Sequence, residues 1–169
     1  MFENFVVAGR ADEEFVAKLL VANKGGTVTI SSAEDDIHNH VDFWWTPANS
    51  SQRIGIDVKG LKKIRRNDFR VNNVDTWIET MNVLGQPGWV YGKATYIAFR
   101  RIGKVVFVVR ETLARFIEDK IAGKPLVGRN PMCCYVPYRR ANGFPPRQDI
   151  ITLVPLDDIE SLAEFIITH

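Results

Sequence analysis

The spacing of apolar residues along this chain follows two periods, one helical and one extended, and together they predict a mixed α/β fold. Apolar positions at helical spacing predict helices over residues 10–23, 111–122 and 157–168. Gly25 and Gly26 are expected to end the first of these helices. Asp157 and Glu160 stand at the start of the last one, like the two polar residues of a capping box.

Runs of β-branched and aromatic residues between the helices predict strands. The expected strands cover residues 28–31, 38–45, 53–59, 76–83, 95–99, 102–110 and 150–154, and the expected loops cover 32–36, 60–72 and 124–148. The polar turn over 46–53 predicts that the strands on its two sides form a hairpin. The simplest packing is a single domain over residues 1–169, an α/β fold with a central mixed β-sheet flanked by helices.

Composition narrows the class of protein and its partners. A chain of 169 residues with ordinary apolar and charged fractions can bury a core. No apolar run approaches the roughly 20 residues that a membrane helix needs, so a cytoplasmic protein without a membrane partner is expected. The net charge of +2 indicates little, but clustered cations suit a polyanion such as DNA. The clusters are Lys59, Lys62, Lys63, Arg65, Arg66 and Arg70 in one stretch, and Arg139, Arg140 and Arg147 in another.

Two acids in otherwise apolar strands are the main candidates for chemistry. The predicted hairpin would bring Asp42 and Asp57 close together. Because side chains alternate along a strand, Lys59 points to the same face as Asp57. A charge in an apolar strand costs free energy unless it is paired, and a divalent cation such as Mg²⁺ or Mn²⁺ relieves the repulsion between two carboxylates. The plain alternative is that both acids face water at an edge of the sheet.

This constellation resembles the PD-(D/E)xK nuclease superfamily, in which an acid on one strand is followed, on the next, by Asp or Glu, any residue, and Lys. Asp42 matches the first acid, and Asp57-Val58-Lys59 matches the second motif. The proline that usually precedes the first acid is absent, since Val41 stands there. The segment 9–20 also looks like the first helix of archaeal Holliday-junction resolvases and related small nucleases.

The resemblance implies a restriction-endonuclease-like fold and a DNA endonuclease that hydrolyses phosphodiester bonds with Mg²⁺ or Mn²⁺. Asp42 and Asp57 would ligate the metal together with the carbonyl of Val58, and Glu13 would bind it directly or through water. Lys59 would position the attacking water. A junction resolvase would act as a symmetric homodimer. No pattern of base-reading side chains is recognisable, so cutting would be structure-selective or non-specific rather than directed to a defined recognition sequence.

Several assignments stay open at the level of sequence. On the first helix, Glu13 lies at the edge of the apolar stripe, Asp12 lies within it or caps the helix, and Glu14 lies on the far side. His40 would share a strand face with His38 and Asp42, as a transition-metal ligand or as part of a half-exposed polar face. Glu79 is either a further site acid or a strand residue facing solvent.

Two other functions compete with the nuclease. The first is a nuclease-like fold that binds nucleic acid without cutting it. The second is a structural protein of a phage or mobile element, in which positions 42, 57 and 59 are ordinary surface residues. The basic stretch begins beside the candidate site, which favours phosphate contacts over a merely solvated loop. Arg139 and Arg140 would contact a DNA backbone or another subunit.

Overall fold

The computed structural model describes residues 3–64, 69–140 and 147–169, and the side chains from Arg10 onward within these ranges. The chain divides into two compact units. The first unit contains Met1–Asn73, Lys93–Val109 and Ala163–His169, and the second contains Val74–Gly92 and Arg110–Leu162. The single domain expected from the sequence stays a prediction. Among the described residues, no helix is both long and apolar enough to cross a membrane.

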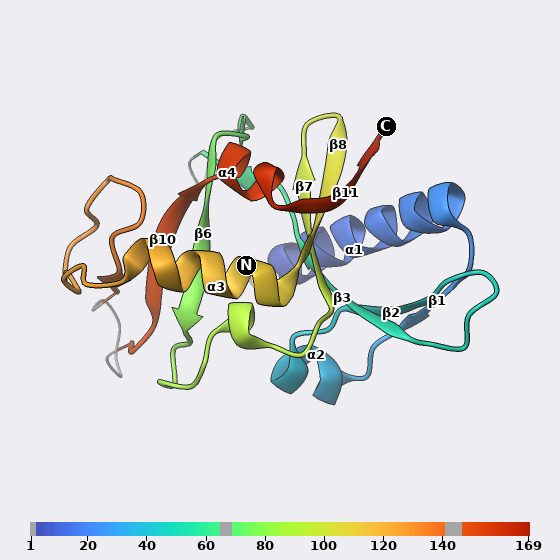
Figure 1. The fold of residues 1–169 in the computed structure, drawn as a ribbon, viewed down its shortest axis with the longest axis horizontal. Helices are drawn as coiled ribbons and strands as arrows, with labels where there is room; N and C mark the ends of the chain where they lie inside the picture. The colour runs from blue at the N-terminus through green and yellow to red at the C-terminus, as the bar shows by residue number, and fades with distance from the viewer. Residues whose placement is uncertain (1–2, 65–68, 141–146) are drawn as a thin grey trace. The chain divides into compact units, whose positions relative to one another are not determined.

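A mixed sheet forms the centre of the first unit (Figure 1). In spatial order its strands are β1 (Thr27–Ile30), β2 (Phe43–Thr46), β3 (Ile54–Lys59), β7 (Tyr96–Arg101), β8 (Lys104–Val109) and β11 (Ala163–Thr168). β3 pairs with β7 in parallel, and the other neighbours pair antiparallel. The predicted central mixed sheet flanked by helices is therefore confirmed.

Helix α1 (Glu3–Lys24) covers one face of this sheet. Its buried Val16 and Leu20 pack in one cluster with side chains of β2, β3, β7, β8 and β11. The helix ends where Gly25 adopts a left-handed conformation (φ 71°) and its carbonyl accepts a hydrogen bond from the Trp45 indole at 2.9 Å. A Cβ at Gly26 would overlap the carbonyl of Thr46, so the turn needs glycine there.

The segment between β1 and β2 differs from the prediction. Residues 33–39 form helix α2 (Ala33–Asn39) instead of a loop and the start of a strand. Ser32 caps the helix by accepting the Asp35 N–H at 3.1 Å, and acids in the first turn favour its dipole. His40 ends it in a left-handed conformation (φ 52°). The predicted strand over 38–45 is therefore wrong in its first half, because local capping outcompetes extended structure.

The end of the chain differs as well. The helix predicted over 157–168 is confirmed only as α4 (Leu156–Ser161), and the rest of it is wrong. Residues 163–168 form β11, which pairs with β8. Phe165, Ile166 and Ile167 alternate between faces there, with Ile167 buried in the core cluster and Ile166 exposed. Pairing with a distant strand decides the structure of this segment.

The basic stretch after β3 was expected to be a loop, and part of it forms a short hairpin instead. Strands β4 (Lys62–Lys63) and β5 (Val71–Asn72) pair antiparallel. The ladder continues one step further, because the Ile64 N–H donates to the Arg70 carbonyl at 3.1 Å. Arg65 and Arg66 lie outside the described residues.

The second unit contains a smaller sheet in the order β6–β10–β9. Its elements are β6 (Asp75–Met81), the 3₁₀ turn η1 (Trp89–Tyr91), α3 (Arg110–Ile121), β9 (Tyr138–Arg139), β10 (Ile150–Pro155) and α4. The predictions of β6, α3 and β10 are confirmed. Buried Ile78, Leu113, Ile117, Val154 and Ile159 provide its apolar interior.

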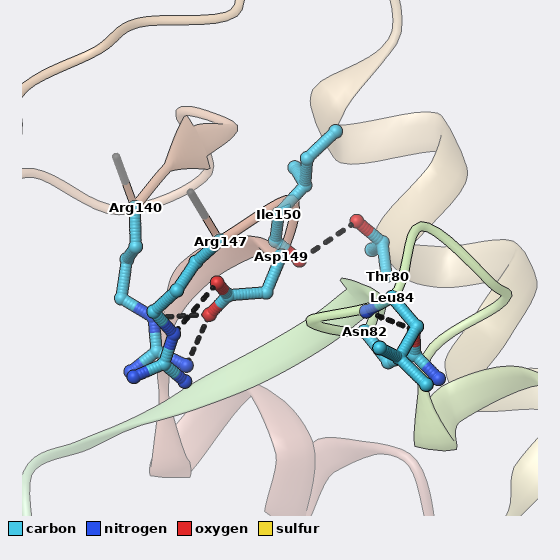
Figure 2. Close-up of polar contacts among 7 residues, drawn as sticks. All are labelled: Thr80, Asn82, Leu84, Arg140, Arg147, Asp149 and Ile150. Carbon is cyan, nitrogen blue, oxygen red and sulfur yellow. Dashed lines mark hydrogen bonds and ion pairs between the residues drawn. The ribbon is translucent and has the colours of Figure 1, made fainter. Parts of the chain in front are cut away.

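A charged cluster stabilises one end of this second sheet (Figure 2). Asp149, which is 0 % exposed, lies directly before β10. Its carboxylate accepts hydrogen bonds from the guanidinium of Arg140 and, at 3.2 Å, from the Nε of Arg147. Beside it, the Thr80 hydroxyl donates to the Ile150 carbonyl at 3.2 Å and ties β6 to β10. The two arginines thus neutralise a carboxylate that water does not reach.

Replacing both Arg140 and Arg147 with Met should lower the free energy of unfolding by about 2–4 kcal/mol, because a buried carboxylate would lose both of its cations. Either single replacement should cost less, since one guanidinium remains. Urea unfolding followed by circular dichroism measures the difference. Arg139→Met is the matched control, because Arg139 is exposed on β9. An equal effect of the control and the double variant would contradict the structural role.

Candidate active site

The hairpin of β2 and β3 brings two carboxylates together in the first unit. Asp57 lies within β3 and is 2 % exposed. Asp42 lies directly before β2, one step beyond the paired residues Phe43 and Ile56. The Asp42 N–H donates to the Ile56 carbonyl at 2.8 Å, and its Oδ2 accepts the Val58 N–H at 2.5 Å. The Asp42 carboxylate therefore takes the place that a backbone carbonyl of β2 would occupy if the pairing with β3 continued to Val58.

Lys59 is the cation of this pair. Its Nζ lies 2.7 Å from Asp57 Oδ1, as expected for two residues on one face of a strand. Asp57 Oδ2 is buried and has no hydrogen-bond partner. A buried acceptor without a partner costs free energy, so this oxygen is ready to bind a donor or a cation.

Burial and the closeness of the two carboxylates determine the electrostatics of the site. Burial, and then the neighbouring Asp57, raise the pKa of Asp42 to about 7, although the Val58 N–H and Lys59 act to lower it. Near neutral pH, Asp42 is thus divided between its protonated and charged forms. A bound cation would favour the charged form.

Glu13 interacts electrostatically with this pair, and Asp36 interacts with Glu13. Burial, and then Asp36, raise the pKa of Glu13 on α1, and Asp57 also contributes to the rise. Asp36 lies on α2 and was not singled out from the sequence, because its segment was expected to be a loop. The pattern Ser32-x-x-Asp35 was the available signal for a helix there.

His40 lies near the site because it ends α2, and not because it belongs to a strand as predicted. It ends α2 and so does not share a strand face with His38 and Asp42, which makes that prediction wrong. Burial lowers the pKa of His40, and Asp57 acts in the opposite direction. The imidazole is therefore neutral at pH 7 and can accept a proton or a hydrogen bond.

Asp12 serves the structure around the site. Its carboxylate is paired with the guanidinium of Arg100 on β7, which in turn lies 4.2 Å above the Phe15 ring. A Cβ at Gly60, the residue after Lys59, would overlap the Asp12 carboxylate. Asp12 is thus fixed between α1, β7 and the end of β3. Neither Arg100 nor the requirement at Gly60 was visible in the sequence, since both depend on long-range packing.

These contacts favour Glu13 as the helix acid of the site. Asp12 is already neutralised by arginine. Glu14 is exposed and lies 3.7 Å from Lys18, one turn further along the helix. Asp57 contributes to the raised pKa of Glu13, after burial and Asp36.

The predicted phosphate-binding residues divide between the two units. Lys62 lies near the site: burial, and then Lys59, lower its pKa, while Asp12 and Asp57 act to raise it, although the residue as a whole is exposed. Lys63 is exposed on the same hairpin. Arg139 and Arg140 belong to the second unit, where Arg140 is engaged by Asp149. Glu79 lies on β6 of that unit, opposite Ile151.

The donor set fits a hard divalent cation. It offers the carboxylates of Asp42 and Asp57, including the unpaired Oδ2 of Asp57. The Val58 carbonyl points to the same strand edge as its N–H, the edge that faces Asp42. Within the described ranges, no group of three or more His, Cys, Asp or Glu side chains is arranged to hold a metal. Water and phosphate oxygens would therefore have to complete the coordination, as Mg²⁺ commonly allows.

Comparisons of this chain with protein-family models, curated proteins and solved structures found no match. What the protein does is therefore inferred from the chemistry of its own residues. A buried pair of carboxylates with one lysine can bind a divalent cation, and a cation next to a lysine can hold and activate a phosphodiester or a water.

Gly60→Ala should lower the free energy of unfolding by about 1–3 kcal/mol, because the new methyl group displaces the Asp12 carboxylate from Arg100. Chemical unfolding of the full chain measures this. Gly128→Ala is the matched control, since nothing lies within 4 Å of a Cβ at that glycine. Asp12→Ala should make the Gly60→Ala substitution less costly. Strict additivity of the two changes would contradict the proposed contact.

In metal-free buffer, the free energy of unfolding should decrease as the pH rises from about 4 to about 7, because folded Asp42, with a pKa of about 7, holds its proton more tightly than unfolded Asp42. The rise in the pKa of Asp42 on folding corresponds to a loss of as much as about 4 kcal/mol in the free energy of unfolding, and we expect a loss of about 2–4 kcal/mol. The measurement compares wild type with Asp42→Asn at pH 5 and pH 8. The variant should lack this part of the pH dependence, and equal profiles would contradict a raised pKa.

Proposed function

We propose that this protein is a divalent-metal-dependent DNA endonuclease of the PD-(D/E)xK type. The observation that carries the proposal is the buried Asp57, with Lys59 on one carboxylate oxygen, no partner on the other, and Asp42 beside it. Structural acids have no need of an unsatisfied oxygen at a charged, partly exposed strand end. A metal-binding acid does need one.

The arrangement of elements supports a restriction-endonuclease-like fold. A helix carrying Glu13 precedes a meander of β1, β2 and β3, and the acids come from the start of β2 and from β3. This is the order in which the family places its helix glutamate, its first acid and its acid-x-lysine motif. The parallel pairing of β3 with β7 makes the sheet mixed, as the family requires.

Each residue has a role that follows from its surroundings. Asp42, Asp57 and the Val58 carbonyl would hold Mg²⁺ or Mn²⁺, and Glu13 would reach it through water. When bound, the metal would neutralise charge on the phosphate and polarise it for attack. The Lys59 ammonium, fixed by Asp57, is placed to orient a water or a phosphate oxygen. A resolvase-type activity on branched DNA would further require two such sites in a homodimer.

The alternative is a binding module that does not cut. It is favoured by the same ion pair, because Lys59 already compensates Asp57 without a metal. In that case the acids and the lysine stabilise the end of the hairpin, and the basic residues bind nucleic acid alone. The two functions differ in their response to a divalent cation.

Wild-type protein should cleave DNA in Mg²⁺ or Mn²⁺ and not in EDTA, and Asp57→Asn should reduce the rate at least about 100-fold because a metal ligand is lost. Linear duplex, single-stranded and four-way-junction DNA are assayed side by side. Glu14→Gln is the matched control, since that acid is exposed and engaged with Lys18. DNA binding should survive in Asp57→Asn.

Thermal unfolding gives a second readout. Mg²⁺ or Mn²⁺ should raise the midpoint of wild type and have little effect on Asp57→Asn. DNA binding without metal-dependent cutting or stabilisation would favour the binding module. Undiminished cleavage by Asp57→Asn would rule out this site as the catalytic centre.

A further inference from the structure

The β4–β5 hairpin starts at Lys62, three residues after Lys59, at the edge of the candidate active site. Lys62, its first residue, interacts electrostatically with Lys59, Asp12 and Asp57. The pairs Lys62–Asn72 and Lys63–Val71 form the ladder. A substrate strand bound at the two aspartates would therefore lie close to this hairpin.

The hairpin exposes apolar side chains to solvent. Phe69 is 91 % exposed and Ile64 is 52 % exposed. An exposed phenylalanine of this kind gains nothing from the core of the unit and leaves a large apolar ring in water. Exposed aromatic and aliphatic groups that are gathered in one place indicate a contact surface.

Cations surround these apolar groups. Alternation along the strands places Ile64 and Arg70 on one face of the hairpin with Lys62. Phe69 lies at the bend directly before Arg70. All of these cations are exposed residues. Apolar side chains and positive charge thus lie together on this short hairpin. This combination suits single-stranded nucleic acid, whose bases stack on aromatic rings while its phosphates bind cations.

We propose that the β4–β5 hairpin is a stacking arm that binds an unpaired base of single-stranded DNA on Phe69, while Lys62, Lys63 and Arg70 contact phosphates of the same strand. This inference rests on the proposed function, since it names the DNA that the site receives. Bases inside an intact duplex are already stacked and must be extruded at a cost. The preferred substrates are therefore flaps, junctions or other DNA with unpaired bases.

Binding of fluorescein-labelled oligo(dT) and of a duplex of equal length, measured by anisotropy in EDTA with the full chain, tests this. Phe69→Ala should raise the Kd for oligo(dT) about 5- to 100-fold, as expected for loss of one stacked base, and change the Kd for duplex less than about twofold. Phe69→Trp should retain the single-strand affinity. Ile102→Ala, at a residue that is 60 % exposed elsewhere in the same unit, should leave both Kd values unchanged.

The cations are tested in the same assay. Lys63→Ala should weaken binding to both DNAs and reduce the salt slope by about 0.7 for the single strand, as expected for one phosphate contact. Lys18→Ala, at an exposed lysine on α1, is the matched control and should change neither.

Three results would overturn the stacking arm: no oligo(dT) binding by wild type, an unchanged Kd in Phe69→Ala, or an equal loss for oligo(dT) and duplex. The nuclease and the arm can fail separately. Metal-dependent cleavage with an unchanged Kd in Phe69→Ala would leave the nuclease and remove the arm. A selective loss in Phe69→Ala without any cleavage would leave the arm and remove the nuclease.

Discussion

The first unit depends on one constraint, the burial of two carboxylates at the end of the β2–β3 hairpin. The register of the hairpin places Asp42 beyond Phe43 and next to β3, where its carboxylate accepts the Val58 N–H. A slip of one residue would turn Asp57 and Lys59 into the core under α1, which Ile56 and Val58 now fill. The apolar pattern of β3 and the position of its charges are thus fixed by the same pairing.

Two buried acids, Asp57 and Asp149, and two half-buried acids, Asp12 and Asp42, are neutralised to different degrees. Asp149 has two guanidinium groups, and Asp12 has one. Asp42 and Asp57 have Lys59 as their adjacent cation, and one oxygen of Asp57 has no hydrogen-bond partner. Asp149 and Asp12 are therefore each paired with guanidinium, whereas Asp42 and Asp57 share one lysine. This contrast within one molecule supports function at Asp42 and Asp57 independently of any resemblance.

The sequence predicts those parts of the structure that local periodicity decides. The helix α1, the strands β3, β7 and β8, and the helix α3 all bury a regular apolar stripe or run. The helix α2 buries no residue, so no stripe indicates it, and only its cap could have done so. For β11, the capping signal at Asp157 is real but holds only for the short α4, and pairing with β8 determines the rest. The helix predicted over this last segment failed because the sequence alone does not reveal which distant segments make contact.

The candidate site divides in the same way. Asp42, Asp57 and Lys59 could be found because strand alternation and a short turn relate them locally. Arg100 and Gly60 act on Asp12 from distant parts of the chain, so only the fold shows that Asp12 is engaged, which favours Glu13 as the helix acid of the candidate site. Asp36 was missed because it depends on α2.

In the proposed nuclease, the net charge of Asp42, Asp57 and Lys59 would relate the protonation of Asp42 to the binding of a phosphodiester. With both aspartates ionised, Lys59 leaves one excess negative charge, which repels a phosphodiester. A divalent cation turns this into one excess positive charge, and protonation of Asp42 leaves the site neutral. Proton and cation therefore compete for Asp42, whose pKa of about 7 makes the competition sensitive near neutral pH. In the proposed nuclease, cation binding would also offset the repulsion by Asp57 that, after burial, raises this pKa, so the same step would allow DNA to approach the site.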